Sequence, residues 1–543
     1  MAQVAEQAGA PVSAEQIDAI FAEWDRSDSP GCALAVVQNG EVVYARGYGM
    51  ANLDLGVAIT PASVFHVASV SKQFTAFAVA LLAEEGKLAL DDDVRKYVPE
   101  LPDFGQKITL RNLLQHTSGL RDQYGLFRLA GWRTGDIQAF DDVIDFARWH
   151  RRLNFAPGDE YSYCNTSYTL LVLVVERVSG QRFRDFVQER LLLPLEMTHS
   201  HIHDDVEEIV PGRASAYAPR KEGEGQGKGG FKVADSHVEA IGAICLYTTA
   251  EDLARWLRNL GERRVAGAVV ELAATPGVLN NGKQTRYGLG QMVRTYRGLK
   301  TVSHGGVDAG YRAEMLWFPE ASFGVAILAN LATIRPGALA RRVADLYLAD
   351  RLGPDELRDA PAVDLPEAEQ ARYSGLYRDE RRRLTHTVKV EAGKLTINSG
   401  FGDRMELVPL GDSRFRLGEP PVGVEIVPGE SGRLEVRMLE PDGDAAIFTA
   451  AEAAAPTPEA LAAYAGSYVC PELGGVRYSF LLRDGALVLR RRKEKDQTLE
   501  PTVADAFALP NGDLVFSRDG RGDVDGFDIY TDRIRYLRFA REA

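Results

Sequence analysis

Apolar and polar positions along this chain follow two different periods, and the period changes with position. Near the start, Ser13 and Gln16 are spaced as in a capping box and open an amphipathic helical pattern. Two β-rich runs, 32–37 and 42–45, then flank Asn39-Gly40, which is the strongest short-range signal for a β-hairpin. The chain therefore predicts a helix followed by a hairpin at its beginning.

Helical periodicity dominates residues 69–350, with one β-rich exception. The run 73–83 is apolar on nearly every helical face, as in a helix buried inside a domain. A segment near 301–330 has the pattern of a β-meander with a turn at Pro319-Glu320. A hairpin, then helices, then strands predict an α+β domain whose antiparallel sheet is assembled from both ends of this stretch.

The residue composition changes after residue 352, where prolines separated by acidic residues indicate a linker. An internal repeat follows, because Tyr373-Ser-Gly-Leu-Tyr377 returns as Tyr464-Ala-Gly-Ser-Tyr468, each before a glycine-centred hairpin. Alternating strands with regularly spaced turns predict two small antiparallel barrels. We expect a domain at 1–352, a linker at 353–371, and β-barrel domains at 372–452 and 453–543.

Composition limits the classes of partner and the cellular compartment that we expect for this chain. The 543 residues carry a net charge of −14, which argues against nucleic acid as the main ligand. No apolar stretch is long enough to span a bilayer, so we expect no membrane partner. The start Met1-Ala-Gln-Val-Ala-Glu-Gln-Ala lacks a signal peptide and the four cysteines suit buried free thiols. These features favour a cytoplasmic protein, or a secreted one if a leader was removed, and leave a homo-oligomer open.

Ser69 and Lys72 begin the buried helical run. Positions i and i+3 share a helix face, so the Lys72 amine can reach the Ser69 hydroxyl. A helix N-terminus offers backbone donors to an oxyanion, and a buried lysine is costly unless it has a partner. The pair predicts a nucleophilic serine activated by lysine. The alternative is a capping serine beside a lysine whose ammonium reaches solvent.

Two further elements are weaker by themselves. Tyr163 and Asn165 lie two positions apart on a loop before another apolar helix, and Tyr163 could shuttle a proton if an ammonium favoured its phenolate. His304 precedes Gly305 and Gly306 at the end of a predicted strand, where the glycines let a substrate approach the strand edge. The alternatives are packing tyrosines and a structural histidine.

Together these elements resemble the family of class C β-lactamases, penicillin-binding DD-peptidases and related esterases. The shared order is Ser-x-x-Lys, then Tyr-x-Asn, then a basic residue before glycine. The likeness is greatest to the D-aminopeptidase branch, which shares residues 69–75, 118–122, 161–165 and 304–306 and carries two C-terminal β domains. The resemblance implies a β-lactamase-like/DD-peptidase domain followed by two lipocalin-like barrels.

The resemblance also implies a role for each position. Ser69 would form an acyl-enzyme, Lys72 and Tyr163 would share general-base and general-acid duties, and Asn165 would orient Lys72 and the substrate. Which residue takes the serine proton stays open. The remaining roles fall on the strand: His304 replaces a lysine, Gly305 and Gly306 admit the substrate, and the Val307 N–H completes an oxyanion hole with that of Ser69.

The histidine at 304 changes the expected chemistry. In β-lactamases and carboxypeptidases the lysine helps to hold a substrate carboxylate, which a neutral imidazole does less well. We therefore predict a cofactor-free serine hydrolase of small amides, short peptides or esters, first of all a D-aminopeptidase-like amidase or peptidase. The alternatives are esterase or β-lactamase/DD-carboxypeptidase activity, and a non-catalytic binding or assembly module of the same fold.

Two other sequence features have structural explanations that require no function. The charged run 490–495 would favour an acidic substrate end if it reached the site, but a solvated turn is the simpler interpretation. Alternate histidines at 199, 201 and 203 near two aspartates resemble metal ligands. Their spacing fits a surface strand, so we expect no metal.

Overall fold

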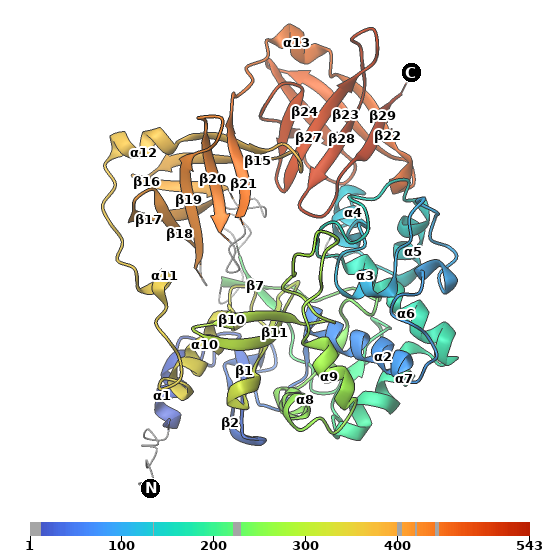
Figure 1. Ribbon diagram of the computed structural model, residues 1–543, viewed down its shortest axis with the longest axis vertical. Helices are drawn as coiled ribbons and strands as arrows, with labels where there is room; N and C mark the ends of the chain where they lie inside the picture. The colour runs from blue at the N-terminus through green and yellow to red at the C-terminus, as the bar shows by residue number, and fades with distance from the viewer. Residues whose placement is uncertain are drawn as a thin grey trace.

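The computed structural model describes residues 12–133, 135–220, 230–398, 404–418, 421–439 and 445–542. The N-terminal octapeptide behind the compartment prediction lies outside these ranges. The structure has three main parts: the N-terminal region (residues 12–352), the closed barrel (strands β14 to β21) and the C-terminal sheet (strands β22 to β29). Figure 1 shows the closed barrel and the C-terminal sheet side by side above the N-terminal region.

A six-stranded antiparallel sheet organises the N-terminal region in the order β10-β11-β12-β13-β1-β2. Its register pairs Cys32 with Ala329, so the first hairpin joins the late meander as the sequence predicts. Asn39 and Gly40 both have positive φ (52° and 81°), as a two-residue hairpin turn requires. The strands are β1 (Cys32–Gln38), β2 (Glu41–Tyr48), β10 (Met292–Tyr296), β11 (Leu299–Asp308), β12 (Tyr311–Phe318) and β13 (Phe323–Ala329).

Short strands complete the β-structure of this region. They are β3 (Met50–Asn52), β4 (Val57–Ala58), β5 (Phe65–His66), β6 (His201–Ile202), β7 (Tyr217–Pro219), β8 (Phe231–Val233) and β9 (Leu246–Thr248). The three strands β5, β9 and β6 form a small sheet of their own.

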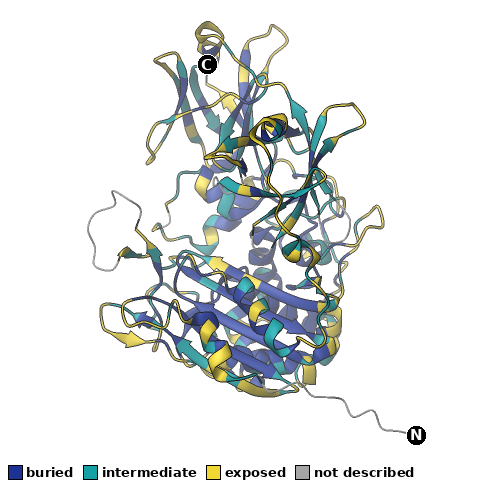
Figure 2. Ribbon diagram, turned by 90° about the vertical axis from the view of Figure 1, so that its left-hand side faces the viewer, coloured by how far each residue is buried: buried dark blue, intermediate teal, exposed yellow. Residues whose placement is uncertain are grey.

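Helices cover both faces of the six-stranded sheet, which Figure 2 shows as a buried layer. One face carries α1 and α10, and the predicted capping box at Ser13 and Gln16 is present on α1. The other face carries α8 and the larger helical core. The helices are α1 (Ala14–Phe21), α2 (Lys72–Glu84), α3 (Leu110–Leu114), α4 (Gln123–Leu129), α5 (Phe140–Trp149), α6 (Asn165–Ser179), α7 (Phe183–Val187), α8 (Ala250–Glu262), α9 (Gly267–Ala273) and α10 (Pro336–Tyr347).

Two eight-stranded antiparallel sheets follow. The first closes into a barrel, formed by β14 (Gly375–Asp379), β15 (Leu384–Glu391), β16 (Lys394–Asn398), β17 (Arg404–Gly411), β18 (Arg414–Leu417), β19 (Val422–Pro428), β20 (Leu434–Leu439) and β21 (Ala445–Ala451). The second runs β25-β24-β23-β22-β29-β28-β27-β26. Its strands are β22 (Gly466–Cys470), β23 (Val476–Arg483), β24 (Ala486–Arg491), β25 (Gln497–Thr498), β26 (Ala506–Leu509), β27 (Gly512–Arg518), β28 (Val524–Thr531) and β29 (Leu537–Arg541).

The internal repeat has a structural counterpart. A short helix precedes each sheet, α12 (Glu367–Tyr373) and α13 (Pro458–Ala462). The Tyr377 hydroxyl donates to the Tyr373 carbonyl at 2.7 Å, and the Tyr468 hydroxyl donates to the Tyr464 carbonyl at 2.9 Å. The predicted fold class, an α+β domain of the β-lactamase type followed by two antiparallel β domains, is confirmed. Among the residues that the structure describes, the edges of the second sheet meet at a single bridge, between Pro501 and Phe507, so this sheet is less completely closed than the first.

The C-terminal sheet shares a hydrophobic core with the N-terminal region, whereas the closed barrel has its own. One continuous cluster includes Phe127 and Phe146 of α4 and α5, Tyr478 of β23, and Ile534 of the connection between β28 and β29. The closed-barrel core is separate. The C-terminal sheet is therefore packed onto the N-terminal region through a shared hydrophobic core.

Three smaller predictions can be placed on this fold. All four cysteines are buried free thiols, as expected. Residues 353–371, expected as a linker, contain α11 (Glu356–Asp359) and most of α12. The domain boundaries themselves stay a prediction. Within the described ranges, none of the helices combines the length and the apolar character needed to cross a membrane.

Candidate active site

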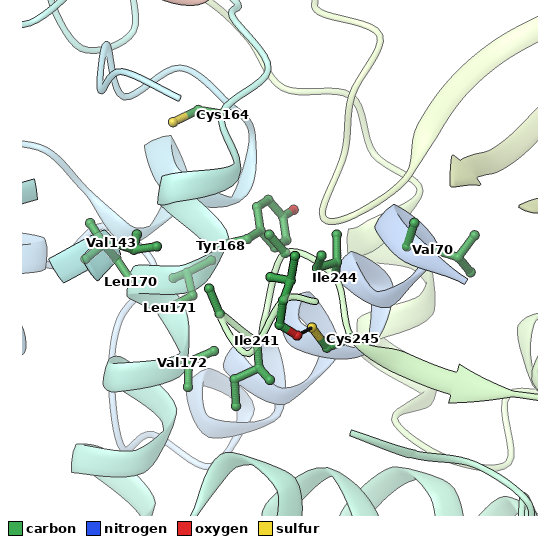
Figure 3. Close-up of a cluster of buried hydrophobic side chains, with 14 of the residues drawn as sticks. Val70, Val143, Cys164, Tyr168, Leu170, Leu171, Val172, Ile241, Ile244 and Cys245 are labelled. Atoms are coloured by element: carbon green, nitrogen blue, oxygen red, sulfur yellow. Dashed lines mark hydrogen bonds between the residues drawn. The ribbon is translucent and has the colours of Figure 1, made fainter. Parts of the chain in front are cut away.

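Ser69 lies in a short 3-10 helix, Ala68–Ser71, directly before α2. Ala68 has a positive φ of 46°, a conformation that L-residues seldom adopt and that marks strain at functional sites. Val70 belongs to a buried hydrophobic cluster that also contains Tyr168 of α6, Ile241 and Ile244. Figure 3 shows these four side chains. The segment that carries Ser69 packs against β11, β12 and β9, while the Ser69 side chain itself is only half-buried.

Lys72 is fully buried and has three polar partners. Its Nζ lies 3.1 Å from Ser69 Oγ, 2.7 Å from Asn165 Oδ1 and 2.8 Å from the Ala243 carbonyl oxygen. Burial lowers the pKa of Lys72 well below its usual value, and the nearby carboxylate of Asp122 opposes that shift in part. The sequence-predicted group of Ser69, Lys72 and Asn165 is therefore brought together in one hydrogen-bonded arrangement.

Asp122 holds Asn165 in the orientation that this arrangement needs. Its Oδ2 accepts from both the backbone N–H and the side-chain Nδ2 of Asn165, each at 2.7 Å. The amide oxygen of Asn165 is thereby turned toward Lys72. The other oxygen of Asp122 caps α4 by accepting from the Tyr124 N–H at 3.1 Å. Sequence reasoning assigned no role to Asp122, although it ends the family-like segment 118–122.

Tyr163 lies beside Lys72, whose Nζ is 4.7 Å from the centroid of the phenol ring. Burial raises the pKa of Tyr163, and its hydrogen bond with Ser69 only partly offsets the effect. The phenol is therefore neutral near pH 7, so the phenolate considered from the sequence is disfavoured. His116 supports this loop, because its Nδ1 accepts from the Cys164 N–H at 3.1 Å and its ring lies 4.3 Å from that of Tyr163.

His304 reaches the same cluster from β11. Its Nε2 is 2.9 Å from the Tyr287 hydroxyl and its Nδ1 is 2.7 Å from the Gly305 carbonyl oxygen, while its ring lies 6.1 Å from that of Tyr163. Burial lowers the pKa of His304 to about 3, and the Lys72 charge acts in the same direction. His304 is thus a neutral imidazole, and Tyr287 is a second residue that sequence reasoning did not assign.

The glycines after His304 bring β11 close to the segment before Ser69. A Cβ on Gly306 would lie 2.2 Å from the Val67 carbonyl oxygen, so only glycine fits there. A Cβ on Gly305 would lie 2.9 Å from a carboxylate oxygen of Glu314. Val307 is 69% exposed, and pairing with β10 ends at Ser303, which leaves this edge of β11 open beside Ser69.

The C-terminal sheet adds a cation whose position could not be predicted from the sequence. Residues 532–536 connect β28 to β29, and the Arg533 guanidinium lies 4.9 Å from the Tyr163 ring centroid. The Asn154 side chain donates to the Arg533 carbonyl at 2.9 Å, which anchors the loop on the N-terminal region. More than 350 residues separate Arg533 from Tyr163 in sequence, so no local pattern could connect them.

The charged run 490–495 lies against the N-terminal region as well. Lys493 pairs with Asp136 at 3.3 Å, and Arg491 and Glu494 line a cavity of about 270 Å³ together with Asp122 and Arg533. The run is therefore not simply a solvated turn, although Arg490 pairs with Asp496 on the exposed side.

The histidines considered as metal ligands lie elsewhere. His201, His203 and Glu208 offer ligand atoms within 4.8 Å of one another, and Arg184 already pairs with Glu208 at 2.7 Å. β6 is an edge strand that pairs with β9, and the three histidines differ in burial, with His199 exposed, His201 half-buried and His203 buried. The expectation that no metal binds there stays a prediction.

Comparison with known proteins agrees with this geometry. A family model described as Beta-lactamase matches residues 17–350. Penicillin-binding protein 4* of Bacillus subtilis (strain 168) is 28% identical over 437 residues, which cover 76% of this chain and 92% of the relative. A D-aminopeptidase of Gluconobacter oxydans (strain 621H) is 26% identical over 528 residues, covering 91% of this chain and 93% of the relative.

The fold also matches solved structures. An octameric penicillin-binding protein homologue from Pyrococcus abyssi superposes with a TM-score of 0.57 at 22% identity. The match covers 89% of this chain and 100% of the homologue, so it includes the β domains as well as the N-terminal region.

Proposed function

Since this chain belongs to the Beta-lactamase family, we propose that it is a serine hydrolase in which Ser69 forms an acyl-enzyme with small amide, peptide or ester substrates. The D-aminopeptidase-like cleavage of short peptides and amides is the first candidate. The relative that spans almost the whole chain is named a D-aminopeptidase, which supports this choice.

The observation that carries the proposal is the set of partners around Lys72. Two of them, the Asn165 amide oxygen and the Ala243 carbonyl, can only accept hydrogen bonds. The third, the Ser69 hydroxyl, can donate. A neutral amine has two N–H groups for the two acceptors and one lone pair for the hydroxyl. Because burial favours that neutral form, Lys72 is suited to take the proton of Ser69.

The proposed reaction then proceeds in two halves. The Ser69 proton passes to Lys72 Nζ while Oγ bonds to the substrate carbonyl carbon. Backbone N–H groups of Ser69 and Val307 would stabilise the oxyanion. When the C–N or C–O bond breaks, the leaving atom takes a proton from the Lys72 ammonium by way of the neutral Tyr163 hydroxyl. Water then attacks the ester by the same proton route, which releases the acid and restores Ser69.

His304 bears on the choice among substrates. A neutral imidazole held between Tyr287 and the Gly305 carbonyl means that β11 offers no positive charge to a substrate carboxylate at the position where β-lactamases have a lysine. We therefore place β-lactam turnover behind amide and ester cleavage. Self-association of the chain stays a prediction, which light scattering would test.

The decisive test is the variant Ser69→Ala, assayed with D- and L-aminoacyl anilides, short esters and a cephalosporin. We expect hydrolysis of the preferred substrate to fall by about 10⁴-fold or more, because the nucleophile is absent. Circular dichroism should show an unchanged fold. Thr198→Ala, an exposed hydroxyl far from the site in sequence, serves as the control and should keep full activity.

Covalent labelling separates this proposal from a non-catalytic role. A fluorophosphonate probe should modify the wild-type protein and leave Ser69→Ala unmodified. A binding or assembly module would show no Ser69-dependent adduct, and retained hydrolysis by Ser69→Ala would overturn the mechanism.

A further inference from the structure

Arg533 is anchored by its backbone while its side chain extends over the candidate site. The Arg533 carbonyl accepts from Asn154 Nδ2 at 2.9 Å and from the Asp122 N–H at 3.4 Å. The next residues fix the loop further, because Arg535 pairs with Glu160 at 2.9 Å and Ile534 is buried against Gly125. The guanidinium is thus presented at a defined place, 4.9 Å from the Tyr163 ring centroid.

The guanidinium keeps donors available. Its Nε pairs with Asp532 at 3.3 Å, and across the described ranges its two terminal amino groups donate no hydrogen bond. The side chain is 33% exposed, so a ligand can reach it. A planar guanidinium with free terminal donors is the side chain best suited to a carboxylate.

The other basic groups near the site are neutral or act on other residues. Lys72 is bonded to Ser69, Asn165 and Ala243, and His304 is neutral. The charge of Arg294 on β10 acts on the buried carboxyl of Glu314 as well as on His304. Arg128 and Arg491 line the cavity beside Arg533, and Arg491 pairs with Glu494. Arg533 is the arginine that lies over the Tyr163 ring, where it can take up a substrate anion.

The position of Arg533 also says which part of a substrate it would meet. In the proposed reaction the leaving nitrogen must come within hydrogen-bonding distance of the Tyr163 hydroxyl. A group attached to that nitrogen then lies beside Tyr163, where Arg533 is. If the leaving group is an amino acid, its carboxylate is two bonds from the nitrogen.

We propose that Arg533, supplied by the C-terminal sheet, is the specificity-determining residue that binds the free carboxylate of an amino-acid leaving group. The preferred substrates are then short peptides whose scissile bond precedes a carboxy-terminal residue, ahead of simple amides. This inference rests on the proposed function and names the substrate class of the same site.

The test compares two substrates that differ only in this carboxylate. The aminoacyl group that the wild-type enzyme hydrolyses best is joined to glycine or to glycinamide, and kcat/KM is measured for both. We expect the wild type to favour the free carboxylate. Arg533→Gln should lower the glycine-to-glycinamide ratio about tenfold or more, the usual scale for a lost hydrogen bond to a charged group. Arg533→Lys should give an intermediate ratio.

The measured quantity is the glycine-to-glycinamide ratio of kcat/KM, because Arg533 also lies over the Tyr163 ring and its loss can lower the rate of hydrolysis of both substrates. Arg294→Gln is the matched control, and its ratio should equal that of the wild type. An unchanged ratio in Arg533→Gln, or a drop confined to Arg294→Gln, would overturn the inference while leaving the serine-hydrolase proposal intact.

A binding experiment keeps the inference testable even without turnover. Titration calorimetry on Ser69→Ala compares the same two compounds as ligands, with and without Arg533→Gln. We expect the glycine compound to bind more tightly than the glycinamide only when Arg533 is present. Absence of Ser69-dependent hydrolysis would reject the proposed function, whereas equal binding of the two compounds would reject the role of Arg533.

Discussion

The pH at which Lys72 loses its proton decides when Ser69 has a base. Below that pH the ammonium has no lone pair, and above it the amine is free to accept a proton. Since burial lowers the pKa of Lys72 well below lysine's ordinary value, we expect kcat/KM to rise with pH along a limb centred well below pH 10.5. His304, with a pKa of about 3, is already neutral above pH 5 and should not contribute to that limb.

A pH–rate profile of His304→Gln checks this assignment. The variant should show the same limb as the wild type, at a lower plateau if the contact with Tyr287 matters. Disappearance of the limb in His304→Gln would mean that the imidazole, and not the Lys72 amine, controls the rate.

Single residues differ in how far their roles could be predicted from sequence. Ser69 and Lys72 are three positions apart on one helical segment, so local geometry alone predicts their contact. Asp122 acts through Asn165, which follows it by 43 positions. The burial of Asp122 cannot be predicted from the sequence. Arg533 is a more extreme case, since its place depends on how two distant parts of the chain pack.

At the scale of elements, two short segments must be aligned for an oxyanion hole to form. The strand β5 leads into Ser69, and β11 carries Val307. Besides the close approach at Gly306, a buried pair joins them, since His66 Nδ1 lies 3.4 Å from Asp308 Oδ2. His66 Nε2 accepts from the Cys245 N–H at 3.1 Å, which leaves the imidazole proton on Nδ1, facing Asp308.

We expect Asp308→Ala to lower kcat about tenfold or more with a smaller effect on KM. The substitution removes the carboxylate that faces the buried His66 Nδ1 at 3.4 Å, a contact that does not have hydrogen-bond geometry, and so frees β11 to shift relative to Ser69. Asp308→Asn, which keeps a polar group of the same shape there, should recover most of the rate. Equal losses in the two variants would show that the negative charge matters and the alignment does not.

Elements with a local cause were the ones that the sequence predicted well. The hairpin follows from Asn39 and Gly40, the helix start from Ser13 and Gln16, and the repeat from two tyrosine pairs. Closure of the barrels has no such local cause. The bridge at Pro501 and the three residue pairs between β14 and β21 depend on where distant edges meet.

At the scale of the whole molecule, a buried ion pair joins the C-terminal sheet to the N-terminal region. Arg121 is fully buried, and its Nη1 donates to Glu472. The same guanidinium donates to the carbonyls of Arg535 and Tyr536 at 3.0 Å, and the Arg151 N–H donates to Glu472 at 2.7 Å. The sequence offered no sign of this junction, because each partner looks like an ordinary charged surface residue.

Removal of one partner should be costly here. We expect Glu472→Gln to destabilise the junction by about 3 kcal/mol, since it leaves the buried Arg121 charge without its counterion. Calorimetry should show a lower temperature for the first unfolding transition. Glu542→Gln is the control, because Glu542 forms an exposed pair with Arg477 at 2.6 Å and should change stability by only about 0.5 kcal/mol. Equal effects of the two substitutions would mean that the buried ion pair contributes no more to stability than an exposed one.

Arg121 and Asp122 are neighbours in the chain with opposite duties. One side chain binds the C-terminal sheet, and the other sets Asn165 against Lys72. A geneticist who selects for lost activity should therefore recover substitutions at Glu472 or in residues 532–536 beside those at Ser69. Exchange of the C-terminal sheet between homologues would likewise yield inactive chimeras unless the partners of Arg121 were exchanged together with it.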